Sequence, residues 1–260
     1  MSESADLKTL YRDPSAVAAY WRRQATDLLA EERFSRTLRA ELFDHSWIIT
    51  VRAFLEEGRI ADGARVLEVG CGWGRSAVGL LRFRPRLDYV GIDLVGDFLD
   101  RARAVLADHV GACRAELRQA DACALPFPDA SFDAVVTARV LQYVADPGRA
   151  LREAWRVLRP GGRIVVIVPS GWNAVQRLLY HTRLVSPRAL GGWLGEAGFV
   201  GCRSRSVGFL PTRWHRFAWQ SRALAAERFL EAAPLLRHLG GLALACGTKS
   251  GGVVGADAWT

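Results

Sequence analysis

The chain has 260 residues, of which half are apolar and 24% are charged, and its formal net charge is +8. This length suits one α/β domain with a sizeable core or two small domains, and no apolar run approaches the ~18–20 residues that span a bilayer. The N-terminus lacks the basic and apolar regions of a signal peptide, and the five scattered cysteines form no C-x-x-C pair. These features argue against a disulfide framework, a metal site and secretion, so a cytoplasmic protein is expected.

Two helices are predicted before the first strand, over residues 15–33 and 37–57. The tripeptide Asp-Pro-Ser at 13–15 is a start signal for the first helix, and Gly58 ends the second. The apolar faces of these helices would enclose too small a core to fold alone. Residues 1–57 are therefore predicted to form an N-terminal helical lid over the functional site.

From residue 64 onward, short apolar segments alternate with amphipathic ones, as strands alternate with helices. Strands are expected over 64–69, 87–92, 115–120, 132–137 and 163–168. Helices are expected over 74–83, 95–108 and 147–158. The run Arg159-Pro160-Gly161-Gly162 is predicted to be a turn. This alternation predicts a parallel sheet that is covered by helices on both faces.

After residue 168 the alternation is interrupted. Helices are expected over 172–182, 187–197 and 218–232, and strands over 199–208 and 241–248. Residues 171–249 are predicted to combine the last strands of the sheet with an insertion that shapes the acceptor pocket. Residues 250–260 have little to pack against and are expected to form a loose tail.

The segment VLEVGCGWGRS at 66–76 places three glycines at alternate positions directly after the first strand. A glycine loop between a strand and a helix opens a ligand crevice at the carboxyl ends of the strands. Glu68 lies near the end of that strand, and Asp93 ends the second strand, 19 residues after Gly74. A carboxylate at the second position can bind both hydroxyls of a ribose. The sequence therefore predicts a nucleoside ligand.

Three details argue against NAD as that ligand. The third glycine comes one residue earlier than the dinucleotide motif requires. Glu68 would repel a pyrophosphate but would suit an ammonium group. Asp121 closes the third strand, where the edge of an adenine would lie. A nucleoside that carries an amino acid satisfies all three observations.

The motifs EVGCGWG, VGID, QADA and VLRPGGRIVV together resemble those of class I S-adenosylmethionine-dependent methyltransferases. The likeness is greatest to the small-molecule group that includes ubiquinone-biosynthesis methyltransferases. It covers residues 60–170 well, and 187–210 and 241–249 loosely. The resemblance implies an α/β, Rossmann-like, doubly wound and mostly parallel sheet of seven strands, with a cofactor-binding core at 58–170. The implied cofactor is S-adenosyl-L-methionine.

The resemblance also implies which residues bind the amino-acid end of the cofactor. Glu68, with the backbone around Gly70 and Gly72, would hold the methionine. The segment through Ala138 and Arg139, after the fourth strand, would run beneath the methionine and face the transferred methyl group.

At the nucleoside end, the resemblance implies that Asp93 binds the ribose hydroxyls and that Leu94 packs on the adenine. Asp121 and the backbone of Ala122 would contact the adenine edge. These residues close the second and third strands of the predicted sheet.

Candidate catalytic residues are Tyr143, His181 and His215. Methyl transfer from a sulfonium is an in-line displacement, in which the protein mainly aligns the nucleophile and excludes water. A general base is needed only when the acceptor holds its proton. Tyr143 stands where relatives often carry His, and both histidines fall in the variable region. A packing role is the alternative for each of the three.

The basic excess is concentrated between residues 177 and 240, which contain ten Arg and three Glu. Within it, residues 209–230 interleave aromatic and basic side chains, which suits a hydrophobic or anionic small-molecule acceptor. A solvated basic face or an amphipathic packing helix is the simpler interpretation. Nucleic acid is disfavoured, because the motifs of nucleobase-amino and cytosine-C5 methyltransferases are missing from the sequence.

These observations predict a methyltransferase that acts on a small molecule, at oxygen, in secondary or envelope metabolite synthesis. Two alternatives stay open. One is an RNA methyltransferase, and the other is a protein that binds S-adenosylmethionine without transferring its methyl group.

Overall fold

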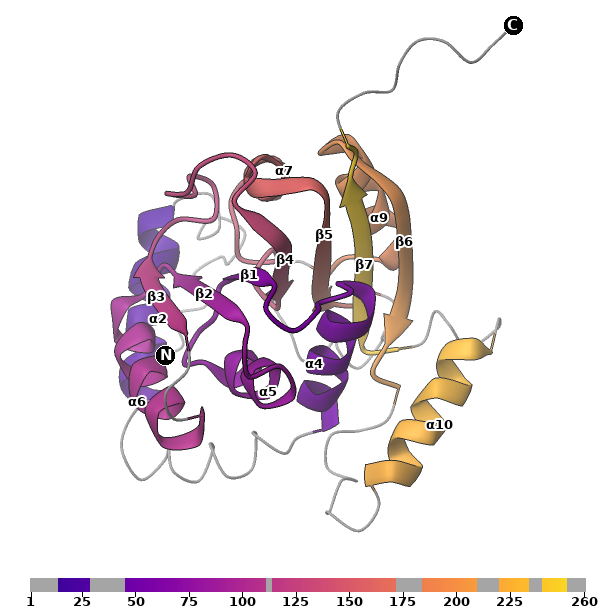
Figure 1. The fold of residues 1–260 in the computed structure, drawn as a ribbon, viewed down its shortest axis with the longest axis horizontal. Coiled ribbons are helices and arrows are strands. Elements are labelled where there is room, and N and C mark those ends of the chain that lie inside the picture. Colours follow the sequence, from indigo (N-terminus) through magenta and orange to yellow (C-terminus); the bar gives the residue numbers. More distant parts are fainter. Residues whose placement is uncertain are drawn as a thin grey trace, which may run out of the picture.

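The computed structural model describes residues 14–28, 45–110, 114–171, 184–209, 220–233 and 240–251. They form a seven-stranded sheet in the order β3-β2-β1-β4-β5-β7-β6 (Figure 1). The strands are β1 Arg65–Val69, β2 Asp88–Asp93, β3 Ala115–Gln119, β4 Phe132–Ala138, β5 Leu158–Pro169, β6 Phe199–Val207 and β7 Leu242–Lys249. Neighbours from β3 through β5 are parallel, whereas β7 is antiparallel to both β5 and β6. The predicted mostly parallel sheet is confirmed.

Helices cover both faces of the sheet. The described helices are α2 Pro14–Leu28, α4 His45–Glu57, α5 Arg75–Phe83, α6 Gly96–Val110, α7 Pro147–Val157, α9 Pro187–Glu196 and α10 Gln220–Ala232. Because side chains alternate along a strand, Val66 of β1 packs in one cluster with α4, α5 and α6, and Leu67 packs in the other with α7 and α9. The sheet is therefore doubly wound. Helix α9 is capped by Ser186, whose Oγ accepts a hydrogen bond from Ala189 N at 3.2 Å.

The two N-terminal helices are packed differently. Ile49 and Phe54 of α4 are fully buried in the main core cluster, among residues of α5 and β5. In contrast, α2 contacts α6, and its Trp21 lies against Phe98 with 6.4 Å between the ring centroids. Within the segment predicted to be a lid, α4 is thus part of the core, and α2 is an outer helix.

The predicted turn at residues 159–162 is wrong. These residues belong to β5, which begins at Leu158, and Leu158 is fully buried opposite Phe132 of β4. The pairing resumes at Arg163, so four residues of β5 lie opposite the single residue Asp133 in an irregular bulge. Asp133 holds this bulge with a 2.5 Å ion pair to Arg159. Burial of Leu158 therefore extends the ladder through a Pro-Gly-Gly sequence that alone favours a turn.

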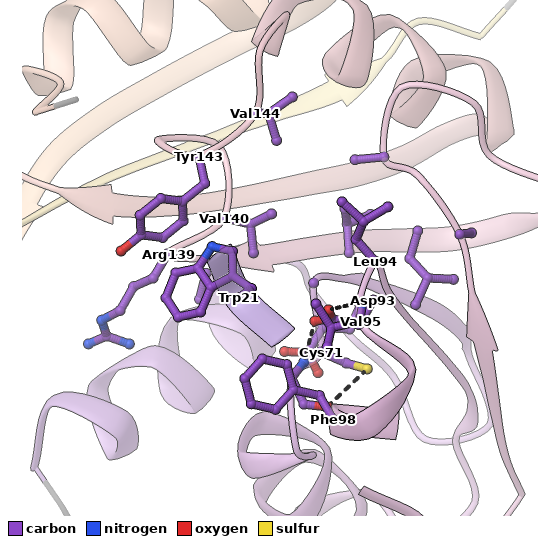
Figure 2. A pocket seen from close by; sticks show the side chains of 18 of the residues that line it. Trp21, Cys71, Asp93, Leu94, Val95, Phe98, Arg139, Val140, Tyr143 and Val144 are labelled. Atoms are coloured by element: carbon purple, nitrogen blue, oxygen red, sulfur yellow. Dashed lines mark hydrogen bonds between the residues drawn. The ribbon is translucent and has the colours of Figure 1, made fainter. Parts of the chain in front are cut away.

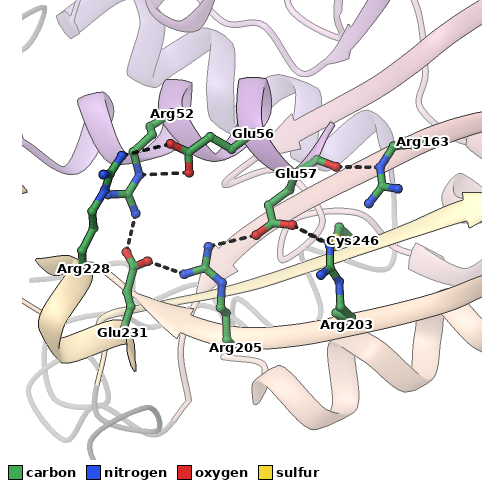
Figure 3. A network of polar contacts seen from close by, with 9 residues as sticks. All are labelled: Arg52, Glu56, Glu57, Arg163, Arg203, Arg205, Arg228, Glu231 and Cys246. Carbon is green, nitrogen blue, oxygen red and sulfur yellow. Dashed lines mark hydrogen bonds and ion pairs between the residues drawn. The ribbon is translucent and has the colours of Figure 1, made fainter. Parts of the chain in front are cut away.

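An ion-pair network joins α10 to α4 and β6 (Figure 3). Glu231 of α10 lies 2.6 Å from Arg52 and 2.5 Å from Arg205, and Glu57 of α4 lies 3.0 Å from Arg205 and 3.1 Å from Arg203. Three arginines of the basic stretch at 177–240 take part, namely Arg203, Arg205 and Arg228. A share of the basic excess is therefore neutralised by carboxylates within the fold.

Several predicted features lie outside the described residues. They are the helix over 172–182, residues 37–44 of the second helix, the candidate residues His181 and His215, and the tail from residue 252. Among the helices that the structure describes, none has the length and apolarity needed to cross a membrane.

Candidate functional site

A cavity of about 320 Å³ lies at the carboxyl ends of β1, β2 and β4. All the residues predicted to bind the cofactor line it, and so does Tyr143: Glu68, Gly70, Gly72, Asp93, Leu94, Asp121, Ala122, Ala138, Arg139 and Tyr143. Residues more than 70 positions apart in the sequence thus line one cavity, as expected at the point where strand order reverses in a doubly wound sheet.

The glycine loop forms one wall of the cavity because its backbone is left-handed. Gly70, Gly72 and Gly74 have φ values of 72°, 53° and 89°. At Gly70, a Cβ would lie 2.1 Å from a methyl carbon of Val140, so only glycine fits there. At Gly72, in contrast, a Cβ would meet no atom within 4 Å. The loop is therefore tightly packed at its base, and open space surrounds its second glycine.

Asp93 ends β2 beside this loop (Figure 2). Its Oδ2 accepts a hydrogen bond from Gly72 N at 2.9 Å, and its Oδ1 accepts one from Val95 N at 3.0 Å. Burial raises the pKa of Asp93, and these backbone hydrogen bonds oppose the rise. Each carboxylate oxygen keeps a further lone pair, which suits the two hydroxyls of a ribose.

Glu68 is the most buried carboxylate of the cavity wall, with 2% of its surface exposed. Tyr89 of β2 donates a 2.7 Å hydrogen bond to its Oε2. Burial and, to a smaller extent, the charge of Asp93 raise the pKa of Glu68 to about 7, against the Tyr89 hydrogen bond and the nearby Ser76 hydroxyl. None of these named neighbours is cationic. An ammonium group in the cavity would supply the missing positive charge.

The adenine end of the predicted site is also assembled. Asp121 Oδ1 accepts a 2.9 Å hydrogen bond from Cys123 N, which fixes the loop after β3. Gln119 donates a 2.9 Å hydrogen bond to the carbonyl of Leu94, and this bond ties the loops after β2 and β3 together. Ala122, between Asp121 and Cys123 in the sequence, lines the same cavity. The residues present fit a nucleoside that carries an amino acid.

Aromatic side chains form another wall, and the sequence analysis missed most of them. Trp21, Trp47, Trp73, Phe98 and Tyr143 all line the cavity. The ring centroids of Trp21 and Tyr143 are 4.9 Å apart, in an edge-to-face contact. Trp47 and Trp21 belong to N-terminal helices with no local motif, so only tertiary packing could identify them.

Two arginines lie against this aromatic wall. The guanidinium of Arg75 is 4.2 Å from the ring centroid of Trp47 and 5.4 Å from that of Trp73, and Arg139 is 5.0 Å from Trp47. Arg139 has a φ of 59°, a left-handed backbone that is uncommon outside glycine, and its N–H donates to Ile167 O at 2.7 Å. The end of β4 thus directs a cationic side chain along the cavity.

Comparison with known sequences places this site in a family. The family described as a methyltransferase domain matches residues 67–166. Demethylmenaquinone methyltransferase of Deinococcus radiodurans is 42% identical over 45% of this chain and 47% of its own length. Phosphatidylethanolamine N-methyltransferase of Cereibacter sphaeroides is 41% identical over 41% of this chain and 51% of its own length. The matched stretch thus spans about half of these relatives.

A longer match extends beyond the core. Demethylmenaquinone methyltransferase of Clavibacter sepedonicus is 32% identical over 56% of this chain and 69% of its own length. The chain belongs to the class I S-adenosylmethionine-dependent methyltransferases. The predicted family and cofactor are thereby confirmed, and the glycine loop, Asp93 and Asp121 lie within the matched domain.

Solved structures of other proteins share the fold. An S-adenosylmethionine-dependent methyltransferase from Thermotoga maritima matches with a TM-score of 0.61, at 20% identity, over 84% of this chain and 95% of its own. The [4+2]-cyclase SpnF matches with a TM-score of 0.60, at 25% identity, over 78% of this chain and 80% of its own. The same architecture is therefore found in a protein that is named for a different reaction.

Proposed function

We propose that this chain transfers the methyl group of S-adenosyl-L-methionine to an oxygen of a small, flat aromatic acceptor, in secondary or envelope metabolite synthesis. The observation that carries the proposal is the cavity itself. It combines carboxylates suited to a nucleoside and an ammonium group with a wall of aromatic rings and arginines. Figure 2 shows Arg139 and Tyr143 on the side away from Asp93 and Leu94.

The residues of the first side would hold the cofactor. Glu68 would bind its ammonium group, Asp93 its ribose hydroxyls, and Leu94 with Asp121 its adenine. When bound, the cofactor supplies an electrophilic methyl group on a sulfonium. The protein then needs to align an acceptor and exclude water, and Trp21 of α2 contributes to the enclosure. We therefore propose that α2, and not the whole of residues 1–57, forms the lid.

The aromatic wall favours an oxygen acceptor over an amine. A cationic amine would be attracted to the faces of the tryptophans, but Arg75 and Arg139 already lie over Trp47. The indole N–H of Trp47 is buried and has no acceptor among the described residues. An oxygen that carries partial negative charge would find a donor and two cations here. Nearby positive charge also favours the ionised form of a phenol, which is the nucleophile.

Two relatives point to different acceptors, as their names state. Menaquinone precursors are flat oxygenated rings, whereas phosphatidylethanolamine carries an amine. The arginines favour the first class. Tyr143, with its ring against Trp21, is placed to contact such an acceptor. Roles for His181 and His215 stay predictions.

The second candidate function is cofactor binding without methyl transfer. The likeness to SpnF, which is 25% identical and is named a [4+2]-cyclase, supports this candidate. An RNA substrate is less favoured, because Arg203, Arg205 and Arg228 are engaged with carboxylates.

Labelled methyl transfer distinguishes these functions. The protein is incubated with methyl-labelled cofactor and, in parallel, a naphthohydroquinone, a primary amine and total RNA, and products are identified by mass spectrometry. We expect a labelled methyl ether of the hydroquinone, and none with Arg139→Gln at the same cofactor occupancy. Label in the amine or the RNA would refute the acceptor class. Stoichiometric cofactor binding without any labelled product from these substrates or from host metabolite extract would support the second candidate.

A further inference from the structure

The hydroxyl of Tyr89 reaches Glu68 across a residue without a side chain. Tyr89 and Gly91 are two positions apart on β2 and therefore face the same side of the sheet, and Gly91 pairs with Glu68 of β1. A Cβ at Gly91 would lie 2.9 Å from the Tyr89 hydroxyl oxygen, and 2.9 Å from Cys71 Sγ. The tyrosine side chain thus passes through the space that Gly91 leaves open. A Cβ at 91 would also lie 2.9 Å from Leu117 Cδ2, so any other residue there would force the hydroxyl or one of these two neighbours to shift.

The Tyr89 hydroxyl donates a hydrogen bond to Glu68 Oε2 at 2.7 Å. Tyr89 is fully buried, and burial together with the charge of Glu68 raises its own pKa well above the ordinary value. It is therefore a neutral donor at and around neutral pH. A buried donor of this kind fixes the orientation of one carboxylate oxygen and leaves the other for a ligand.

The surroundings of Glu68 contain acids and neutral groups. Asp93 at the end of β2 and Cys71 of the glycine loop interact with it electrostatically, and the Ser76 hydroxyl of α5, which is buried and has no hydrogen-bond partner among the described residues, also acts on its pKa. Its neighbour on β4 is Val136, which is apolar. The guanidiniums of Arg75 and Arg139, which line the same cavity, lie over the ring of Trp47. Among the described residues, no group named as acting on the Glu68 pKa is cationic, so a ligand's ammonium group would bring the opposite charge to its ionised form.

We propose that Tyr89 is the positioning residue of Glu68, and that binding of the cofactor's ammonium group releases a proton from the Glu68 carboxyl to solvent. This inference rests on the proposed cofactor site. The ammonium group needs a carboxylate, whereas the free protein holds Glu68 largely protonated below neutral pH. Cofactor affinity should therefore fall as the pH decreases through 7, because each ligand that binds must first displace this proton.

Calorimetry with two ligands tests the inference. S-adenosylhomocysteine carries the ammonium group, whereas 5′-methylthioadenosine keeps the adenosine and the thioether but lacks the amino-acid end. Titration of Asp93 at the ribose end would affect both ligands, so the ratio of their affinities isolates Glu68. For a pKa of about 7, this ratio should fall about tenfold from pH 8 to pH 6. Parallel runs in phosphate and imidazole buffers should show about 0.9 proton released at pH 6 and about 0.1 at pH 8.

Variants then identify the contribution of Tyr89. Tyr89→Phe removes the hydroxyl that stabilises the carboxylate, so the midpoint of the pH profile should rise and the affinity for S-adenosylhomocysteine at pH 7 should fall about tenfold. Affinity for 5′-methylthioadenosine should not change. Gly91→Ala should shift the midpoint in the same direction with the tyrosine intact. Tyr20→Phe is the matched control, because it removes a tyrosine hydroxyl from α2. This variant should keep the wild-type pH profile of binding.

The outcomes separate this inference from the function on which it rests. An affinity ratio that is equal at pH 6 and pH 8, with no proton released by the wild-type protein, would overturn proton-linked binding and leave the cofactor site intact. A Tyr89→Phe profile identical to that of the wild type would remove Tyr89 from its positioning function. Failure of both adenosine ligands to bind the folded protein would overturn the cofactor site as well.

Discussion

Two glutamates of this protein, the partly buried Glu57 and the fully buried Glu68, have opposite electrostatic surroundings. Burial raises the pKa of each. At Glu57, the hydrogen bond and charge of Arg205, with the charge of Arg203, outweigh burial and bring the pKa below its ordinary value. At Glu68, none of the described groups that act on its pKa is cationic, and the pKa rises to about 7. The charge of Glu57 is thus balanced by arginines within the fold, whereas the charge of Glu68 would be balanced by a cationic group of the ligand.

This difference separates a structural site from a functional one. The Glu57 network joins α4, β6 and α10, which are far apart in the sequence (Figure 3). Its charges are held together by mutual attraction, and removing one partner would leave another buried and unbalanced. At Glu68, the surrounding core makes the ionised carboxylate unfavourable in the absence of a ligand, as is common at binding sites. Substitutions at the two positions should therefore affect different measurements.

The largest effect is expected for Glu68→Gln on cofactor binding. The variant keeps the shape of the side chain but cannot neutralise an ammonium group. Loss of one partner of a buried, hydrogen-bonded charge pair typically costs about 2–5 kcal/mol, so affinity for S-adenosylhomocysteine should fall at least ~30-fold. Isothermal titration calorimetry at pH 8 measures this. A Kd within threefold of the wild-type value would show that Glu68 does not bind the ammonium group.

The next effect is expected for Glu57→Gln on stability. The substitution leaves Arg203 and Arg205 without their shared carboxylate. Because Glu57 is only partly buried and Arg203 is largely exposed, the loss should be about 1–2 kcal/mol. Urea denaturation should show this loss, and affinity for S-adenosylhomocysteine should remain unchanged. If Glu57→Gln instead weakened cofactor binding as strongly as Glu68→Gln, the separation of the two sites would be wrong.

The two carboxylates also predict opposite pH dependences of the free energy of unfolding. The folded protein holds a proton on Glu68 that the unfolded chain releases above pH 4.5, so this contribution to stability is complete below pH 4.5 and is lost as the pH rises to about 7. At about 1.4 kcal/mol per unit, the loss is up to about 3 kcal/mol. Asp93, whose pKa is also raised, acts in the same direction. Glu57, whose pKa is lowered, contributes stability above pH 4.5 that is lost as the pH falls.

Urea unfolding of the ligand-free protein at pH 5 and pH 7.5 measures this dependence. Glu68→Gln should remove most of the decline between these values and should be more stable than the wild type at pH 7.5. Glu57→Gln should keep the decline. If the free energy of unfolding of Glu68→Gln declined between pH 5 and pH 7.5 as much as that of the wild type, the decline would arise from other groups.

Sequence reasoning succeeded where a function depends on local backbone. The glycine loop, Asp93 and Asp121 follow the ends of successive strands, and parallel strands bring those ends together. It failed where the structure depends on contacts between distant segments. Nothing near Tyr89 or Trp47 marks them as site residues, because the first is placed by Gly91 and the second by the packing of α4. Burial of Leu158 likewise changed a predicted turn into a bulge.

The smallest effect is expected for Trp21→Ala at the edge of the cavity. Trp21 contacts Tyr143 and Phe98 through its ring, and such pairs are worth about 0.5–1.5 kcal/mol beyond their buried area. The KM of the acceptor should rise about threefold to tenfold, and the Kd of S-adenosylhomocysteine should change less than twofold. Steady-state kinetics with the hydroquinone checks this. An unchanged KM would remove α2 from the acceptor site.

The central claim is that the cavity at the ends of β1, β2 and β4 binds S-adenosylmethionine through its carboxylates, and it is tested most directly by ligand binding to the wild type and to Asp93→Ala. Calorimetry at pH 8 should show one S-adenosylhomocysteine bound per chain and no heat with NAD. Asp93→Ala should lose about 1.5–3 kcal/mol of binding free energy, the range for hydrogen bonds to a charged group. Binding of NAD by the wild type, with no response to S-adenosylhomocysteine, would contradict the account.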